Sequence, residues 1–108
     1  MNSNVTSGVD HTKLTENLSV EPPVVNLPNG DVKNPVNFSG TGLPGWMVVV
    51  VSVPFDGTDL ASAFVQADGS WSTDVQLSER SFSAVAFQTN NRERSPFTAI
   101  FDFKVVSG

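Results

Sequence analysis

The sequence predicts an all-β protein, an antiparallel β-sandwich of seven strands, on three observations. No segment carries an apolar period of 3.6 over ten residues, which is the pattern of an amphipathic helix. Short alternating segments recur at spacings of roughly 8–12 residues, with Gly, Pro and Asn turns between them. The longest apolar run, residues 46–53, contains four consecutive valines, and β-branched side chains favour strands. A small barrel with the same number of strands is the alternative architecture.

The first expected strands lie on either side of a sharp turn. Residues 22 and 23 are both proline and mark the start of the folded part. The short apolar segment 24–27 is closed by Asn29-Gly30, a pair that tolerates the positive φ of a tight turn. Residues 36–40 alternate apolar and polar side chains, which predicts a half-buried strand. The valine-rich strand 46–53 follows and ends at Pro54, which cannot donate to a ladder.

The second half of the sequence repeats this punctuation. A weaker strand is expected at residues 60–67, and Asp68-Gly69 then turns the chain into a cleanly alternating strand at 71–77. Residues 81–88 form the next expected strand, followed by a polar loop. The last strand is expected at 97–106, where one face would carry a single apolar stripe. That stripe consists of Phe97, Ala99, Phe101, Phe103 and Val105.

Composition limits the classes of function. The chain has 108 residues and a net charge of -5, which suits one domain and argues against a nucleic-acid binder. It contains no cysteine, which excludes a disulfide framework and any thiolate metal site. No apolar stretch reaches the roughly 18 residues of a membrane span. Residues 1–21 are polar and lack periodicity, so we expect a flexible N-terminal tail or linker before a single domain at 22–108. No signal peptide is visible in this segment.

Two turns and the strands that follow them resemble a known family. They are Gly40-Thr41-Gly42-Leu43-Pro44-Gly45 before the valine strand, and Asp68-Gly69-Ser70-Trp71 before the strand at 71–77. Together they resemble the bacterial immunoglobulin-like domains found in tandem in surface adhesins, over about residues 22–106. The resemblance implies a seven-stranded immunoglobulin-like sandwich that acts as an extracellular or cell-surface spacer or adhesion module, without catalysis.

The sequence departs from the family pattern in two places. Glu79-Arg80-Ser81 stand where the family has a glycine before its aromatic-led strand. The alternate positions of the valine strand are all apolar, where the family places Thr or Ser. If Val48 and Val50 point into the core, the outer face of the sheet carries an apolar group, which Ile100 would extend. We predict that this group is an interaction face, and its members are Met47, Val49, Val51, Val85 and Phe87.

The sequence does not determine what covers this apolar outer face. Such a group would form a patch of a few hundred Å², a size that is often functional on a monomer. The residues before position 22 could cover it. An adjacent domain of a longer chain, a second copy of this chain or another protein could do so as well.

Catalytic and metal sites have little support in the sequence. His11 is the only histidine and lies in the predicted tail, so a Ser-His-Asp triad is not expected, and we predict no enzyme activity and no cofactor. Turn aspartates could bind calcium, although no D-x-D-x-D-G loop is present. These candidates are Asp56, Asp59, Asp68 and Asp102.

Two other functions stay open as alternatives. Trp46 or Trp71 could be the stacking platform of a carbohydrate-binding module, although both fall on the face that we assign to the core. The chain could also be an accessory domain of a larger enzyme or toxin whose chemistry lies elsewhere. The interpretation that we carry forward is a non-catalytic spacer or interaction module of a bacterial extracellular or secreted protein.

Overall fold

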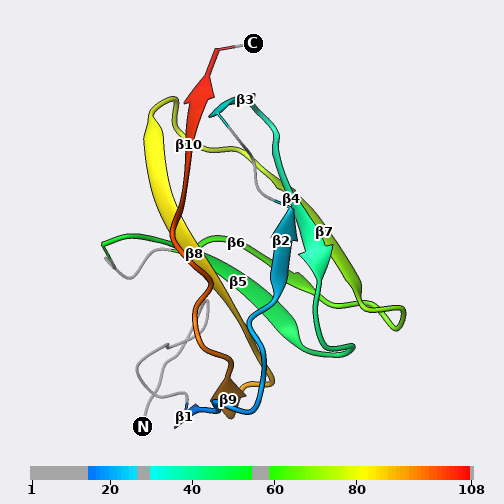
Figure 1. Cartoon of the computed structure of the whole chain (residues 1–108). Helices are drawn as coiled ribbons and strands as arrows, with labels where there is room; N and C mark the ends of the chain where they lie inside the picture. Colours follow the sequence, from blue (N-terminus) through cyan, green and yellow to red (C-terminus); the bar gives the residue numbers. More distant parts are fainter. Residues whose placement is uncertain (1–14, 27–29, 55–58, 108) are drawn as a thin grey trace, which may run out of the picture.

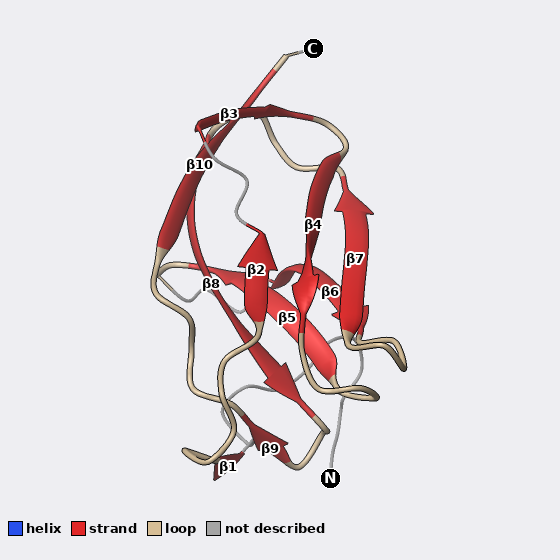
Figure 2. Ribbon diagram, turned by 45° about the vertical axis from the view of Figure 1, so that its right-hand side comes forward, coloured by secondary structure: helices blue, strands red, loops and turns tan. Residues whose placement is uncertain are grey.

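The computed structural model describes residues 15–26, 30–54 and 59–107, which form two β-sheets packed face to face (Figures 1 and 2). This part of the chain contains strands and loops but no helix, and therefore no helix that could cross a membrane. The prediction of an all-β, sandwich-like architecture is confirmed.

The larger sheet is built around one long strand, β8. β5 pairs with β8 on one side and β6 pairs with β5, while β10 lies on the other side and β3 beyond it. The short strands β9 and β1 continue the sheet from the end of β8. The members of this sheet are β1 (Thr15–Glu16), β3 (Gly30–Lys33), β5 (Met47–Ser52), β6 (Asp59–Phe64), β8 (Ser81–Thr89), β9 (Glu93–Arg94) and β10 (Phe101–Val106).

The smaller sheet has three antiparallel strands in the order β2-β4-β7. They are β2 (Val24–Asn26), β4 (Val36–Thr41) and β7 (Ser70–Val75). The strand β4 shows the predicted alternation directly, since Val36 and Phe38 are buried while Asn37 is exposed. The buried side chains, at every second position of these strands, face the larger sheet and fill the space between the two sheets.

The core between the sheets is aromatic. The Phe103 ring stacks on Phe82 with 5.3 Å between centroids and meets Phe38 edge-on at 5.7 Å. Inward residues of β5 and β8 complete the cluster, because every second side chain of a strand faces the same way. The fully or largely buried members are Val36, Phe38, Val48, Val50, Ala61, Val65, Trp71, Phe82, Ala84, Ala86, Phe101, Phe103 and Val105.

The structure adds to and corrects the predicted strand list. Each of the seven predicted segments contains a strand. The described residues hold ten strands, and the three that were not predicted are the short β1, β3 and β9. The sandwich is also not purely antiparallel, since β3 pairs in parallel with β10 and β1 pairs in parallel with β9. β1 and β3 carry no alternation of their own, and each forms beside a strand edge from a distant part of the chain, whereas β9 follows β8 through a tight turn.

The predicted stripe of the last strand is wrong at its start. The strand β10 begins at Phe101, and residues 97–100 form an irregular segment. In this segment Thr98 binds both backbone groups of Ala86 in place of a regular strand pairing. Its N–H donates to the Ala86 carbonyl, and its Oγ1 accepts from the Ala86 N–H. Phe97 consequently packs on the opposite side of the sheet from Phe101, while Ala99 and Ile100 are exposed.

Candidate functional site

The polar contacts of the described chain converge on Gln88 near the end of β8. Gln88 follows Ala84 and Ala86 on the inward side of the strand and is only 3% exposed. Its Oε1 accepts a hydrogen bond from the Leu43 N–H, and its Nε2 donates to the Glu21 carbonyl, each at 2.8 Å. One buried amide therefore joins β8, the turn after β4 and residues 15–21, which we call the leader.

A hollow of about 460 Å³ lies between the leader and the sandwich. Gln88 reaches it from the sandwich side, while Val24 and Leu43 give it an apolar rim, at 57% and 40% exposure. We call it the Gln88 hollow. Its lining consists of Ser19, Val20, Glu21, Pro22, Val24, Thr41, Gly42, Leu43 and Gln88.

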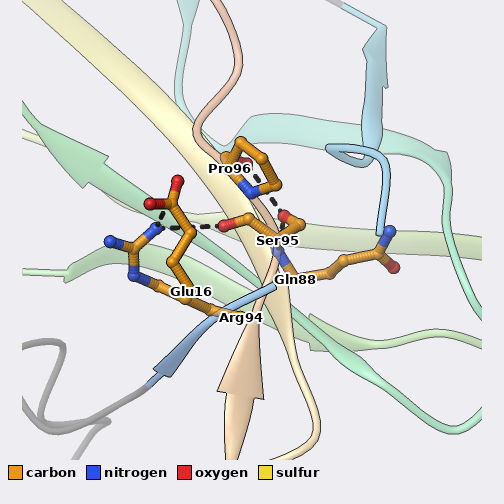
Figure 3. A network of polar contacts seen from close by, with 5 residues as sticks. All are labelled: Glu16, Gln88, Arg94, Ser95 and Pro96. Carbon is orange, nitrogen blue, oxygen red and sulfur yellow. Dashed lines mark hydrogen bonds and ion pairs between the residues drawn. The ribbon is translucent and has the colours of Figure 1, made fainter. Parts of the chain in front are cut away.

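Ser95 fixes the chain where it turns back after β9. Its hydroxyl accepts a hydrogen bond from the Gln88 N–H at 3.1 Å and donates to the Pro96 carbonyl at 2.9 Å. The Ser95 N–H donates to the Gln88 carbonyl at 2.9 Å. Since Ser95 is fully buried, these bonds satisfy its polar groups within the protein. They also hold the segment that carries Phe97 against β8 (Figure 3).

Arg94 links the leader to the outer side of the larger sheet. Its Nη1 lies 3.7 Å from Glu16 Oε2 and donates to the Ser95 carbonyl at 3.1 Å (Figure 3). Its guanidinium carbon lies 4.5 Å from the centre of the Phe97 ring, a cation–π contact. The Glu16 side chain is 43% exposed, so this ion pair contributes at most about 1 kcal/mol.

Backbone hydrogen bonds hold the leader along β9. The Thr15 N–H donates to the Arg92 carbonyl at 3.2 Å, and the Asn17 N–H donates to the Arg94 carbonyl at 2.8 Å. The Asn17 side chain adds a bond to Glu93 at 3.2 Å. Residues 15–21, which the sequence predicts as part of a tail, are thus attached to the sandwich, while residues 1–14 lie outside the described chain.

The predicted interaction face lies on one side of the larger sheet, but most of it is buried. Val49 is opposite Phe87 and Val51 is opposite Val85 across the ladder. These four side chains are at most 5% exposed, and Met47 is half-buried. They form a second hydrophobic cluster with Val53 and Phe97, whose ring meets Phe87 edge-on at 5.6 Å. The group is therefore not an exposed patch in this structure, and a role in association stays a prediction.

The tryptophans differ in their surroundings. Trp71 is 3% exposed, and its Nε1 donates to the Thr41 carbonyl at 3.2 Å. This is the core position that its place in the alternation predicts. Trp46 is half-buried at the start of the valine strand. A sugar-stacking surface is thus not available at Trp71.

The calcium candidates that the structure describes are not grouped into a metal site. His11 and Asp56 lie outside the described residues. Asp68 accepts bonds from the hydroxyl and N–H of Ser70, which lower its pKa from 3.8, and Asp102 accepts from Ser83 on the neighbouring strand. Within residues 15–26, 30–54 and 59–107, no three His, Cys, Asp or Glu side chains are grouped as a metal site requires.

The residues that organise this end of the molecule were missed by sequence reasoning. One signal for Gln88 was present, because Phe82, Ala84, Ala86 and Gln88 share one phase of the alternation. A polar side chain in that phase predicts a buried amide with internal partners. Arg94 and Ser95 gave no such signal, since they lie in a polar loop segment without periodicity.

Comparison with known proteins does not assign a family. The chain matches no model of a known protein family and no curated protein sequence. The functional argument therefore rests on the fold and on the contacts described above.

Proposed function

We propose that this chain is a non-catalytic, immunoglobulin-like module that serves as a spacer or interaction unit of a bacterial extracellular or cell-surface protein. The strand order supports the immunoglobulin-like part of this proposal. Immunoglobulin constant-type sandwiches place strands A, B and E in one sheet and C, F and G in the other. Here β2-β4-β7 correspond to A, B and E, and β5-β8-β10 correspond to C, F and G. The strand β6 departs from that pattern because it pairs with β5.

The observation that carries the spacer role is the position of the two ends of the described chain. The strand β1 lies at one end of the molecule, and β10 runs to the opposite end (Figures 1 and 2). Modules whose chain enters and leaves at opposite ends extend a protein when they are joined in series. The turn motifs that resemble tandem adhesin domains agree with this use.

The buried polar side chains support a non-catalytic role. Gln88, Thr89 and Ser95 are buried, and each forms hydrogen bonds to the backbone. Gln88 lines the Gln88 hollow, but both ends of its amide are already bonded to Leu43 and Glu21, whereas catalytic sites direct unengaged polar groups into a cleft where a substrate can reach them. The polar groups at the end of β8 serve to hold the leader and the segment after β9 in place.

The carbohydrate-binding alternative loses one of its two candidate platforms. A sugar ring stacks on an exposed aromatic face, and Trp71 is buried under β4. Only Trp46 of this pair keeps accessible surface. We therefore favour the spacer or interaction role.

A head-to-tail fusion of two whole chains tests the spacer role by small-angle X-ray scattering. We expect a maximum dimension of at least twice the 40 Å long axis of one copy, because β1 and the end of β10 lie at opposite ends of the molecule. The single chain, measured under the same conditions, is the control. A compact fusion, with its two units side by side, would contradict the proposal.

A further inference from the structure

We propose that the leader is an exchangeable segment, and that the surface it occupies also receives the leader of a second copy of this chain. That surface consists of the edge of β9 and the Gln88 hollow. The inference goes beyond the spacer role and does not depend on it.

The leader buries little apolar surface, since Val20 is half-buried and the other residues from 15 to 21 are exposed or polar. No residue from 15 to 21 belongs to either hydrophobic cluster, and Leu18 is 80% exposed. Its attachments are the two-residue pairing with β9, the Glu16–Arg94 ion pair and a few hydrogen bonds. Net contributions of such bonds are about 0.5–1.5 kcal/mol each. Segments with few buried apolar contacts open long before the whole domain unfolds.

The surface beneath the leader binds a short extended start followed by a turn. The Arg92 and Arg94 carbonyls accept bonds from the Thr15 and Asn17 N–H groups, and such bonds accept any extended segment, as in β-strand addition. The Val20 N–H then closes a turn on the Asn17 carbonyl at 3.1 Å, and the Gln88 side-chain amide donates to the Glu21 carbonyl beyond it. Side-chain contacts then select the sequence, because Glu16 meets Arg94 and Asn17 meets Glu93. The segment that satisfies all of them is the leader itself, from the same copy or from another.

The chain provides a pivot for exchange at Pro22-Pro23. Proline fixes its own φ and pushes the residue before it towards an extended conformation. Pro23 is buried in the domain while Pro22 is exposed, so the leader can swing as one piece from an anchored base. Exchange of an identical element between copies is a low-cost route to a dimer.

The fraction of exchanged leaders depends on protein concentration. A leader bound within its own copy and one bound across copies make the same bonds, so concentration decides between them. A short linker corresponds to an effective concentration of about 1 mM. Exchange should therefore be small in dilute protein and rise steeply as copies are crowded together.

The absence of native cysteine allows a direct trap for exchange. Thr15 and Glu93 are opposed in the parallel pairing of β1 with β9, within the separation that a disulfide bridges. The double variant Thr15→Cys/Glu93→Cys should close within one chain, which tests the geometry. The two single variants, carrying tags of different mass, are then mixed and oxidised at about 10 µM and about 1 mM, on either side of the effective concentration. The control mixture replaces Glu93→Cys with Ser62→Cys, at an exposed position on β6.

We expect the mixed Thr15→Cys and Glu93→Cys chains to form a disulfide heterodimer about tenfold more than the control at about 1 mM, and far less at about 10 µM. A heterodimer yield equal to the control, while the double variant closes within its own chain, would overturn the proposal. Failure of the double variant to close would also overturn it, because the leader would then not occupy β9 as the structure shows. Circular dichroism of each variant confirms that the sandwich is folded.

Discussion

The backbone N–H of Gly42 donates a hydrogen bond to the carbonyl of Gly69, with 2.9 Å between the two atoms. This bond joins the turn before the valine strand to the turn between β6 and β7, which lie in different sheets. These are the two motifs on which the family resemblance rests. Trp71 adds a second link by donating to the Thr41 carbonyl. The two motifs thus form one structural unit that holds the sheets together, and their residues are explained by the fold without a ligand.

Gly40, in the same unit, has no room for a Cβ atom. A Cβ at this position would lie 1.8 Å from the Val24 carbonyl oxygen, a backbone atom that cannot move without separating β2 from β4. We expect Gly40→Ala to destabilise the domain by at least about 3 kcal/mol in urea unfolding. Gly45 is the matched control, because it has a φ of 85° but open space around its Cβ position, so Gly45→Ala should cost about 1–2 kcal/mol. Equal losses for the two variants would contradict the close approach of β2.

The sequence predicts those parts of the fold that bury one face of a strand. Alternation identified β4 and β7 because a half-buried strand must place apolar groups at every second position. β1 and β3 escaped prediction because each pairs with an edge from a distant part of the chain, and β9 because it is only two residues long and follows β8 through a tight turn. Phe97 was assigned to the wrong face for a related reason. The bonds between Thr98 and Ala86 interrupt the strand, and no local pattern reports such an interruption.

The candidate site was predictable to a smaller extent. The phase of Gln88 along β8 indicated a buried amide, but its partners at Leu43 and Glu21 lie far away in sequence. The outer apolar face was identified correctly as one side of a sheet. The residue that covers it could not be predicted, because packing by a distant side chain such as Phe97 leaves no trace in the alternation of β5.

Trp71 provides a test of the core assignment. Trp71→Ala should reduce the free energy of unfolding by about 3–5 kcal/mol, as expected for a buried aromatic side chain. Trp71→Phe retains most of the apolar area but leaves the Thr41 carbonyl without the indole donor, which should cost about 1–2 kcal/mol. Chemical denaturation followed by circular dichroism measures both. A loss below about 1 kcal/mol for the alanine variant, together with weakened sugar binding, would favour the carbohydrate-binding alternative.

Asn34 acts as a side-chain substitute for a strand partner. Its Nδ2 donates to the Leu77 carbonyl at 2.8 Å, and its Oδ1 accepts from the Leu77 N–H at 2.9 Å. We expect Asn34→Ala to destabilise the domain by about 1–3 kcal/mol, because both Leu77 backbone groups lose their partner. Asn37→Ala is the control, since Asn37 is exposed on β4 and its loss should stay within about 0.5 kcal/mol. A similar small effect at both positions would show that water replaces the Asn34 bonds.

Asp68 should make the turn before β7 sensitive to acid. The Ser70 hydroxyl and N–H lower the pKa of Asp68 from 3.8 in the folded state, so ionised Asp68 stabilises the fold. That contribution is present above the unfolded-state pKa and is lost as the pH falls through the lower folded-state pKa. We expect wild type to be more stable than Asp68→Asn at pH 7 and the difference to shrink at pH values below the ordinary aspartate pKa. Thermal unfolding of both proteins across this range measures it, and a difference independent of pH would contradict the assignment.

The outer face of the valine strand gives the sharpest test, because burial and association predict opposite results. Val49 and Val51 are 0% and 2% exposed, and β5 has ladder partners on both sides, in β6 and β8. A threonine hydroxyl in this place would lack a free backbone acceptor and would be buried without compensation, although the side chain keeps its shape. We therefore expect Val49→Thr and Val51→Thr each to cost about 1–3 kcal/mol of unfolding free energy. Val24→Thr is the control on β2, where the side chain is 57% exposed and the change should stay within about 0.5 kcal/mol. Urea unfolding and sedimentation velocity should be measured on the same samples. If stability is unchanged while wild type sediments as a larger species than the two variants, the face is an exposed association surface and the buried second cluster is wrong.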